Sequence, residues 1–128
     1  MPASERAVEL GLAAAQAAAD KLASDILLLD VSAQLVITDV FLLASAPNDR
    51  QVRAIVDDIE EQLRDLGAKP LRREGEKEGR WVLLDFGDLV VHVQHQEERV
   101  FYALERLWKD CPVIPFVDRD RERAAGRS

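Results

Sequence analysis

The residues most able to do chemistry are two aspartates and a histidine, Asp85, Asp88 and His92, which lie within eight positions of one another. Carboxylates and imidazoles are natural metal ligands. However, His92 and His95 are three apart in an expected strand, so they point to opposite faces, and no cysteine is near. Two further interpretations stay open: the aspartates bracket a turn, where Asp is common, or they belong to a partner surface. We expect no metal and no cofactor.

A covalent mechanism has little support in the sequence. Ser32 or Ser45 as a nucleophile would need a positioned base, and the chain holds only two histidines. The single cysteine, Cys111, stands beside Pro112 and is more simply interpreted as a small apolar residue than as a reactive thiol. No phosphate-binding glycine loop of either common pattern is present. We therefore expect no enzymatic activity.

Three helices and five strands are expected to position these residues. The order is helix, two strands, helix, three strands, helix, which favours an α/β (α+β) two-layer domain with a mixed sheet. The expected helices are 4–23, 48–66 and 97–108, and the expected strands are 26–31, 39–46, 69–74, 80–86 and 89–94.

Local signals differ in strength along these elements. Asn48 is a good N-cap for the second helix, which carries one apolar stripe and ends at Gly67. The first helix is rich in alanine, buries little area per residue and is expected to be loosely held. The short glycine-containing connection at 85–88 favours an antiparallel hairpin.

The last helix, 97–108, is expected to be continuous. Val100, Leu104, Leu107 and Trp108 follow helical spacing and share a face, and Trp108 and Phe101 are expected in the core. Beyond it, residues 117–128 read as a disordered charged tail, so residues 1–116 form the expected single domain.

Composition narrows the function classes. The 128 residues carry a formal net charge of -7, so the chain is a poor non-specific binder of nucleic acid, while an acidic surface suits a basic protein partner. The lone cysteine excludes an internal disulfide, and no apolar run is long enough to cross a membrane. The cytoplasm is the expected location.

Trp81 is the best binding candidate from the residues alone. On an alternating strand it shares a face with Leu83 and Asp85, while Phe86 faces the other way. Because three helices are not expected to cover both faces of five strands, a mixed face around Trp81 is expected to stay open. Arg50 and Arg53 on the second helix are either part of the same surface or ordinary solvated charges.

Four blocks in order resemble the ribosomal silencing factor (RsfS, or Iojap) family. They are T-D-V-F-L-L-A-S-A (38–46), N-D-R-Q-V-R-A-I (48–55), E-G followed by W-V-L-L-D-F-G-D-L-V-V-H-V (74–75 and 81–93), and E-R-V-F-Y-A-L-E-R-L-W (98–108). Val40 and Ala46 depart from the family pattern, which commonly has an aromatic residue and a glycine there. Residues 1–25 and 110–128 carry no clear resemblance.

The resemblance implies a translational repressor without catalysis. Such a protein binds the large ribosomal subunit through its protein fourteen, blocks joining of the small subunit sterically and lowers protein synthesis when nutrients are scarce. A homodimer is implied for the free protein. Together with the strand pattern, the resemblance assigns partner contacts to Trp81, Leu83, Asp85, Phe86, Asp88, His92, Asn48, Arg50 and Arg53.

The resemblance also leaves one enzymatic alternative, because the family's fold is similar to that of nucleotidyltransferases. That chemistry needs a Gly-Ser turn and two carboxylates on a following strand. Here Ala44 precedes Ser45, and the carboxylate pairs lie within a helix, at Asp57 and Asp58, or in the tail. We therefore expect a nucleotidyltransferase-like fold that lacks the catalytic residues, with nucleotide binding as the alternative function.

Overall fold

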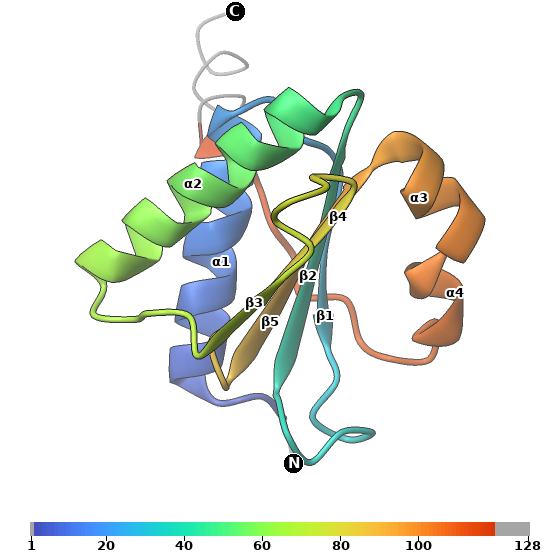
Figure 1. Cartoon of the computed structure of the whole chain (residues 1–128). Helices are drawn as coiled ribbons and strands as arrows, with labels where there is room; N and C mark the ends of the chain where they lie inside the picture. Colours follow the sequence, from blue (N-terminus) through green and yellow to red (C-terminus); the bar gives the residue numbers. More distant parts are fainter. Residues whose placement is uncertain (1, 120–128) are drawn as a thin grey trace, which may run out of the picture.

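A mixed sheet of five strands separates two groups of helices in the computed structural model, which describes residues 2–119 (Figure 1). The strands are β1 (Ser24–Asp30), β2 (Val40–Ala46), β3 (Arg72–Glu74), β4 (Trp81–Asp85) and β5 (Leu89–His95). The helices are α1 (Glu5–Asp20), α2 (Asp49–Asp65), α3 (Gln96–Tyr102) and α4 (Leu104–Leu107). The predicted α+β class and mixed sheet are confirmed.

The sheet order is β1-β2-β5-β4-β3, which the sequence did not reveal. β5 pairs with β2 in parallel and with β4 antiparallel, whereas β1–β2 and β3–β4 are antiparallel. The predicted hairpin is confirmed, since Phe86 N donates to Leu89 O at 2.8 Å where β4 turns into β5. β5 is therefore the centre of the sheet.

Helix α2 forms as its local signals predict. The Asn48 side chain accepts a hydrogen bond from Gln51 N at 2.8 Å, which satisfies one of the free amides at the helix start. The apolar stripe faces the sheet and is fully or nearly buried; it consists of Val52, Ile55, Val56, Ile59 and Leu63.

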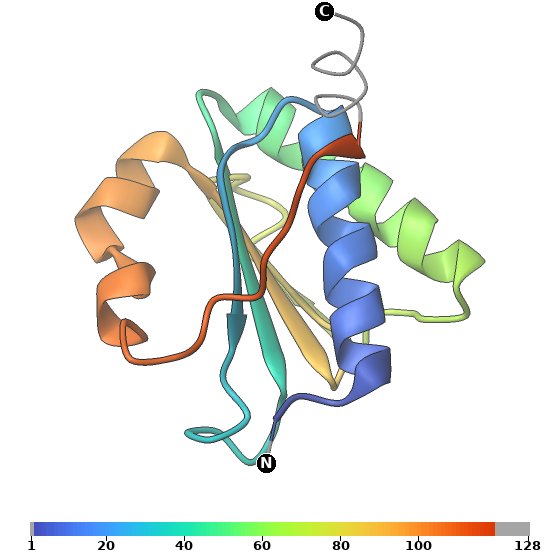
Figure 2. The same ribbon diagram turned by 180° about the vertical axis from the view of Figure 1, so that it is seen from behind.

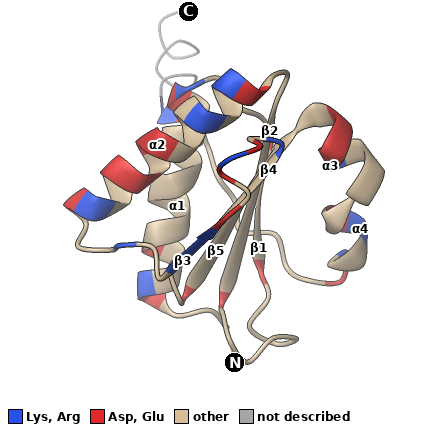
Figure 3. Ribbon diagram, viewed as in Figure 1, with Lys and Arg blue, Asp and Glu red and all other residues tan. Residues whose placement is uncertain are grey.

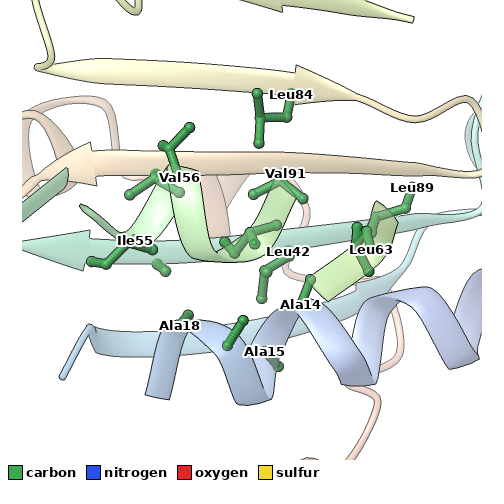
Figure 4. Packing of buried hydrophobic residues seen from close by; sticks show 14 of the residues in the cluster. Ala14, Ala15, Ala18, Leu42, Ile55, Val56, Leu63, Leu84, Leu89 and Val91 are labelled. Carbon is green, nitrogen blue, oxygen red and sulfur yellow. The ribbon is translucent and has the colours of Figure 1, made fainter. Parts of the chain in front are cut away.

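Helix α1 is tightly packed, so the expectation of a loosely held helix is wrong. Its alanines are small enough to let the helix axis approach the sheet and α2, and several of them are completely buried (Figure 4). Gly11 shows how close the approach is: a Cβ there would lie 3.1 Å from Leu28 Cδ2 and 3.2 Å from Val40 Cγ1. The van der Waals contacts of α1 therefore come from the short distance between the helix and the sheet rather than from large side chains.

The opposite face of the sheet is also covered over β1, β2 and β5, so the expected open mixed face is limited to β4, where Trp81, Leu83 and Asp85 are half-buried. A second apolar cluster of Leu29, Phe41, Leu43 and Val90 lies there, joined by Leu104 and Trp108 from the α4 region. His92 and Gln94 on this face are buried as well. Figures 1 and 2 show α3 and α4 standing over this side, away from α1 and α2.

The predicted helix 97–108 is broken into α3 and α4. Ala103 adopts a left-handed conformation (φ 46°, ψ 54°) between them. Consequently Val100 and Leu107 point to solvent, and Phe101, expected in the core, is 78% exposed. Trp108 is half-buried and packs edge-on against Phe41 with ring centroids 5.3 Å apart, so its core assignment holds in part.

The chain after α4 returns along β1 and α1 (Figure 2). Asp30 N donates to Pro112 O and Ile114 N to Leu28 O, each at 2.9 Å, so this segment lines the outer edge of β1. Gln16 on α1 then accepts from Arg119 N and donates to Asp118 at 3.0 Å. The rest of the predicted tail, 120–128, lies outside the described residues. Within the described chain, no helix is long and apolar enough to cross a membrane.

The packing of α1 yields a test. Ala14 is completely buried between α1 and the sheet, so Ala14→Leu should destabilise the fold by about 1–3 kcal/mol through overpacking. Urea unfolding of the purified chain measures the difference. Ala19→Leu, on the same helix but partly exposed, is the matched control and should cost less. Equal stability of the Ala14 variant and the parent would contradict the close packing.

Candidate partner-binding surface

Trp81 lies at the start of β4, on the face covered by α3 and α4. Its indole Nε1 donates to His92 Nδ1 at 3.2 Å, and its ring centroid is 4.7 Å from that of Tyr102. The side chain is half-buried, with one side against the protein and the other open to solvent. A rigid aromatic that is only partly covered is a common interface anchor.

The backbone around Trp81 is fixed by its neighbours. Gly75 has φ 80°, and a Cβ there would stand 1.9 Å from Trp81 O, so only glycine fits. Arg80 donates to Glu98 and to Glu97 at 3.0 Å, which ties the start of β4 to the first turn of α3. The hydrogen bond from His95 N to Arg80 O, at 2.7 Å, closes the same corner.

Asp85 and Asp88 hold a turn, as the simplest interpretation of the sequence has it. Asp85 Oδ1 accepts from Gly87 N at 2.8 Å, within the β4–β5 connection. Asp88 is exposed, and its carbonyl accepts from Asp39 N and Val40 N at 3.1 Å. Among residues 2–119, no three His, Cys, Asp or Glu side chains come together as a metal site would require.

His92 is buried rather than exposed. Only 7% of its surface is accessible, and its ring stands edge-on to Phe41 with centroids 5.2 Å apart. Burial disfavours the charged imidazolium and lowers the pKa of His92 from 6.5 to about 4. The ring is therefore neutral at pH 7, with Nδ1 as the acceptor for Trp81.

The other predicted contact residues do not share one surface. Leu83 lies half-buried beside Trp81 on the same strand face, but Phe86 is buried in the main core on the opposite face. Asn48, Arg50 and Arg53 sit on or before α2, in the other helical layer (Figure 1). Arg53 is engaged there, since its guanidinium donates to Lys77 O at 3.0 Å.

The most exposed apolar residues of α3 and α4 were not predicted as a surface. We call them, together with Trp81, the elbow surface: Trp81, Val100, Phe101, Tyr102 and Leu107. Phe101 and Tyr102 stand edge to face with centroids 5.0 Å apart, which continues the aromatic row from Trp81. Val100 and Leu107 share helical spacing with Leu104, and Phe101 was expected in the core, so the sequence pattern indicated burial for these three residues rather than exposure.

The groups considered for nucleophilic chemistry are occupied or inaccessible. Ser45 is fully buried and hydrogen-bonds to Ser24 O at 3.1 Å. Cys111 is buried too, and desolvation together with nearby Asp110 and Asp30 raises the pKa of its thiol, which disfavours the reactive thiolate. What the arrangement offers is a partly apolar surface on a rigid support.

The buried His92 predicts a specific pH dependence. Because its folded-state pKa lies below that of the unfolded chain, the unfolded state takes up a proton first as the pH falls. Stability from this residue is present above about pH 6.5 and declines towards pH 4, by roughly 3 kcal/mol in all. His92→Asn keeps an acceptor for Trp81 and should remove this part of the decline in urea unfolding followed from pH 7 to 4.5. An unaltered pH profile for His92→Asn would refute the assignment.

Comparison with known proteins gives consistent results. The chain is 46% identical over 100 residues to the ribosomal silencing factor RsfS of Bacillus subtilis, which covers 78% of this chain and 85% of that protein. It is 39% identical over 106 residues to that of Halalkalibacterium halodurans, covering 83% and 91%. It is also 34% identical over 103 residues to the chloroplastic Iojap protein of Zea mays, covering 78% and 43%.

Solved structures agree with this grouping. A crystal structure of a protein from Chromobacterium violaceum superposes with a TM-score of 0.77 at 33% identity, covering 80% of this chain and 85% of that one. One from Bacillus halodurans gives a TM-score of 0.72 at 33% identity, covering 88% and 100%. The family model described as ribosomal silencing factor during starvation matches residues 4–128, so the family likeness extends into both ends of the chain, where the sequence blocks showed none. The chain therefore belongs to the ribosomal silencing factor (RsfS) family.

Proposed function

We propose that this chain is a cytoplasmic translational repressor that binds the large ribosomal subunit through its protein fourteen. Bound at the face where the small subunit docks, it blocks joining of the subunits and lowers protein synthesis under nutrient limitation. The family membership supports the role, and the elbow surface is the observation on this chain that carries the binding.

The elbow surface has the character of a binding site. Val100, Phe101 and Leu107 are 80%, 78% and 69% exposed, although α4 lies beside an apolar cluster that could have accepted them. Clustered exposed apolar side chains rimmed by polar residues are typical of protein interaction sites. Trp81 and Tyr102, whose rings touch at a tilt of 49°, supply rigid aromatic area of the kind found at interface anchors.

Charge favours a basic protein as the partner. The chain carries a net charge of -7, and Figure 3 shows acidic residues along α2 and on α3. Next to the elbow surface, Glu97 and Glu98 are paired with Arg80, and Glu105 is paired with Arg99, so the favourable charge is that of the chain as a whole. Ribosomal proteins are commonly basic. A net negative charge on the chain speeds the approach of a basic partner more than it adds affinity.

The mechanism we propose is occlusion. A 14.3 kDa body seated on the intersubunit face prevents docking by occupying space, so no catalytic group is needed. Among the residues first assigned to contacts, Trp81 meets the partner directly. Leu83 and His92 support Trp81 from the half-buried and buried side. Asp85 and Asp88 hold the β4–β5 turn at the far end of the strand, and Phe86 contributes stability.

Sedimentation with isolated ribosomal subunits tests the binding. The parent chain should migrate with the large subunit and reduce the fraction of joined ribosomes. Trp81→Ala and Phe101→Ala should each weaken binding about tenfold, since truncating a central aromatic anchor commonly removes more than 1 kcal/mol. Leu71→Ala is the matched control, because Leu71 is as exposed as Phe101 (77% against 78%) but lies before β3. Unchanged binding by both aromatic variants, with their fold intact, would refute the surface.

If the free protein is a homodimer that uses the same surface, dimer formation and binding to the large subunit should compete. If two copies cover their elbow surfaces mutually, dimer formation lowers the concentration of free binding sites. A dimer fixed by chemical cross-linking should then bind large subunits much more weakly than the freely exchanging protein at equal chain concentration. Equal affinity of the two forms would exclude a shared surface, while leaving monomer binding in place.

A further inference from the structure

The segment from α3 to α4 is packed with a charge inside and apolar side chains outside. Arg99 is only 7% exposed, while its neighbours Val100 and Phe101 are 80% and 78% exposed. An arginine is rarely buried unless paired, and apolar residues gain free energy when covered. This arrangement therefore needs an interaction that holds it in place.

The break at Ala103 defines the arrangement. Ala103 N donates to Arg99 O at 2.9 Å and closes α3, and Arg106 N donates to Ala103 O at 2.9 Å and opens α4. In between, Ala103 has φ 46°, which is unfavourable for any residue with a Cβ. Alanine is also the strongest helix former, so its own preference opposes the break.

Arg99 and Glu105 form an ion pair across this break. Arg99 Nε lies 2.6 Å from Glu105 Oε2, and the two side chains are 8% and 34% exposed. Residues six apart in a continuous helix lie on different faces and do not meet, because neighbours there are three or four apart. The pair therefore exists only when the helix is broken, and it selects the broken form.

The competing form is the continuous helix that the spacing predicts. In it Val100, Leu104 and Leu107 would form one stripe at helical spacing and cover the sheet, which would bury more apolar area. The structure instead leaves polar groups buried beneath the elbow, and their burial costs free energy. Within the described residues Arg99 Nη1, His92 Nε2 and both polar atoms of the Gln94 amide are buried without a hydrogen-bond partner. Buried polar atoms without partners cost free energy, so the broken form is not the arrangement that stability alone favours.

We propose that Arg99 is a positioning residue for partner binding. Its ion pair with Glu105 locks α3 and α4 at the left-handed Ala103, and this elbow presents Phe101, Tyr102 and Leu107 to the partner in a preformed shape. The inference rests on the proposed function and adds to it the device that shapes the binding surface. Buried ion pairs serve such specificity better than they serve stability.

Ala103 provides a matched pair of variants in the full-length chain. Ala103→Gly accepts the left-handed conformation without strain, so it should bind isolated large subunits as the parent does. Ala103→Val carries a β-branched side chain that this conformation excludes, so it should open the elbow and weaken binding about tenfold or more. The ¹³Cα chemical shift of residue 103 reports the backbone state in the free protein, independently of any partner.

The double variant Arg99→Met/Glu105→Leu separates positioning from stability. Replacing a buried ion pair by apolar residues of similar size is often neutral or stabilising, so its urea midpoint should equal or exceed the parent's. Its affinity for large subunits should nevertheless fall about tenfold. Suppose that the parent binds large subunits and that both this double variant and Ala103→Val bind them equally tightly. The positioning role is then overturned, while the proposed function still stands. If the parent itself does not bind, the proposed function fails as well.

Discussion

The parallel pairing of β5 with β2 is the contact on which the remaining structure depends. It joins segments about fifty residues apart, and its register from Val40↔Leu89 to Ala46↔His95 fixes where every later element begins. β5 is buried on both faces, so a slip by one residue would exchange its two sets of side chains. The helices α1 and α2 seal one face of this pair. On the other face the same register places His92 under Trp81 and starts α3 directly after the strand ends.

The two faces of the sheet meet different physical demands. The α1–α2 face is apolar and closely fitted, with alanines and Gly11 permitting short distances and with its largest side chains fully buried. The α3–α4 face contains His92, Gln94 and Arg99, all buried polar groups whose burial costs free energy unless each is fully paired. Stability therefore comes mainly from the first face. The second face can carry a less stable but more specific arrangement because the first one holds the sheet together.

Sequence reasoning succeeded where local signals and burial agree. Helix α2 has its cap at Asn48, one apolar stripe and a glycine at its end, and all three point to the same element. The β4–β5 hairpin follows from alternation and a short turn in the same way. The strand order did not follow, because the β2–β5 pairing is a contact between distant segments with no local signature. For α1, the alanine-rich composition indicated that each residue buries little area. The helix compensates by lying very close to the sheet, and that closeness depends on Leu28 and Val40 on the facing strands.

The elbow was not predicted from the sequence for a related reason, and that reason bears on the function proposed for the surface. Helical spacing and the preference of Ala103 both indicate a continuous helix, and the Arg99–Glu105 pair, six residues apart, opposes them. A protein that acts by occupying space must remain bound, and residence time is set mainly by dissociation. A surface already held in its bound shape loses less entropy when the partner arrives, so more of the contact energy appears as affinity. Exposing Phe101 and Leu107 on a locked elbow reduces the stability of the free chain, and under the function proposed above it would supply the preformed contact that slow release requires.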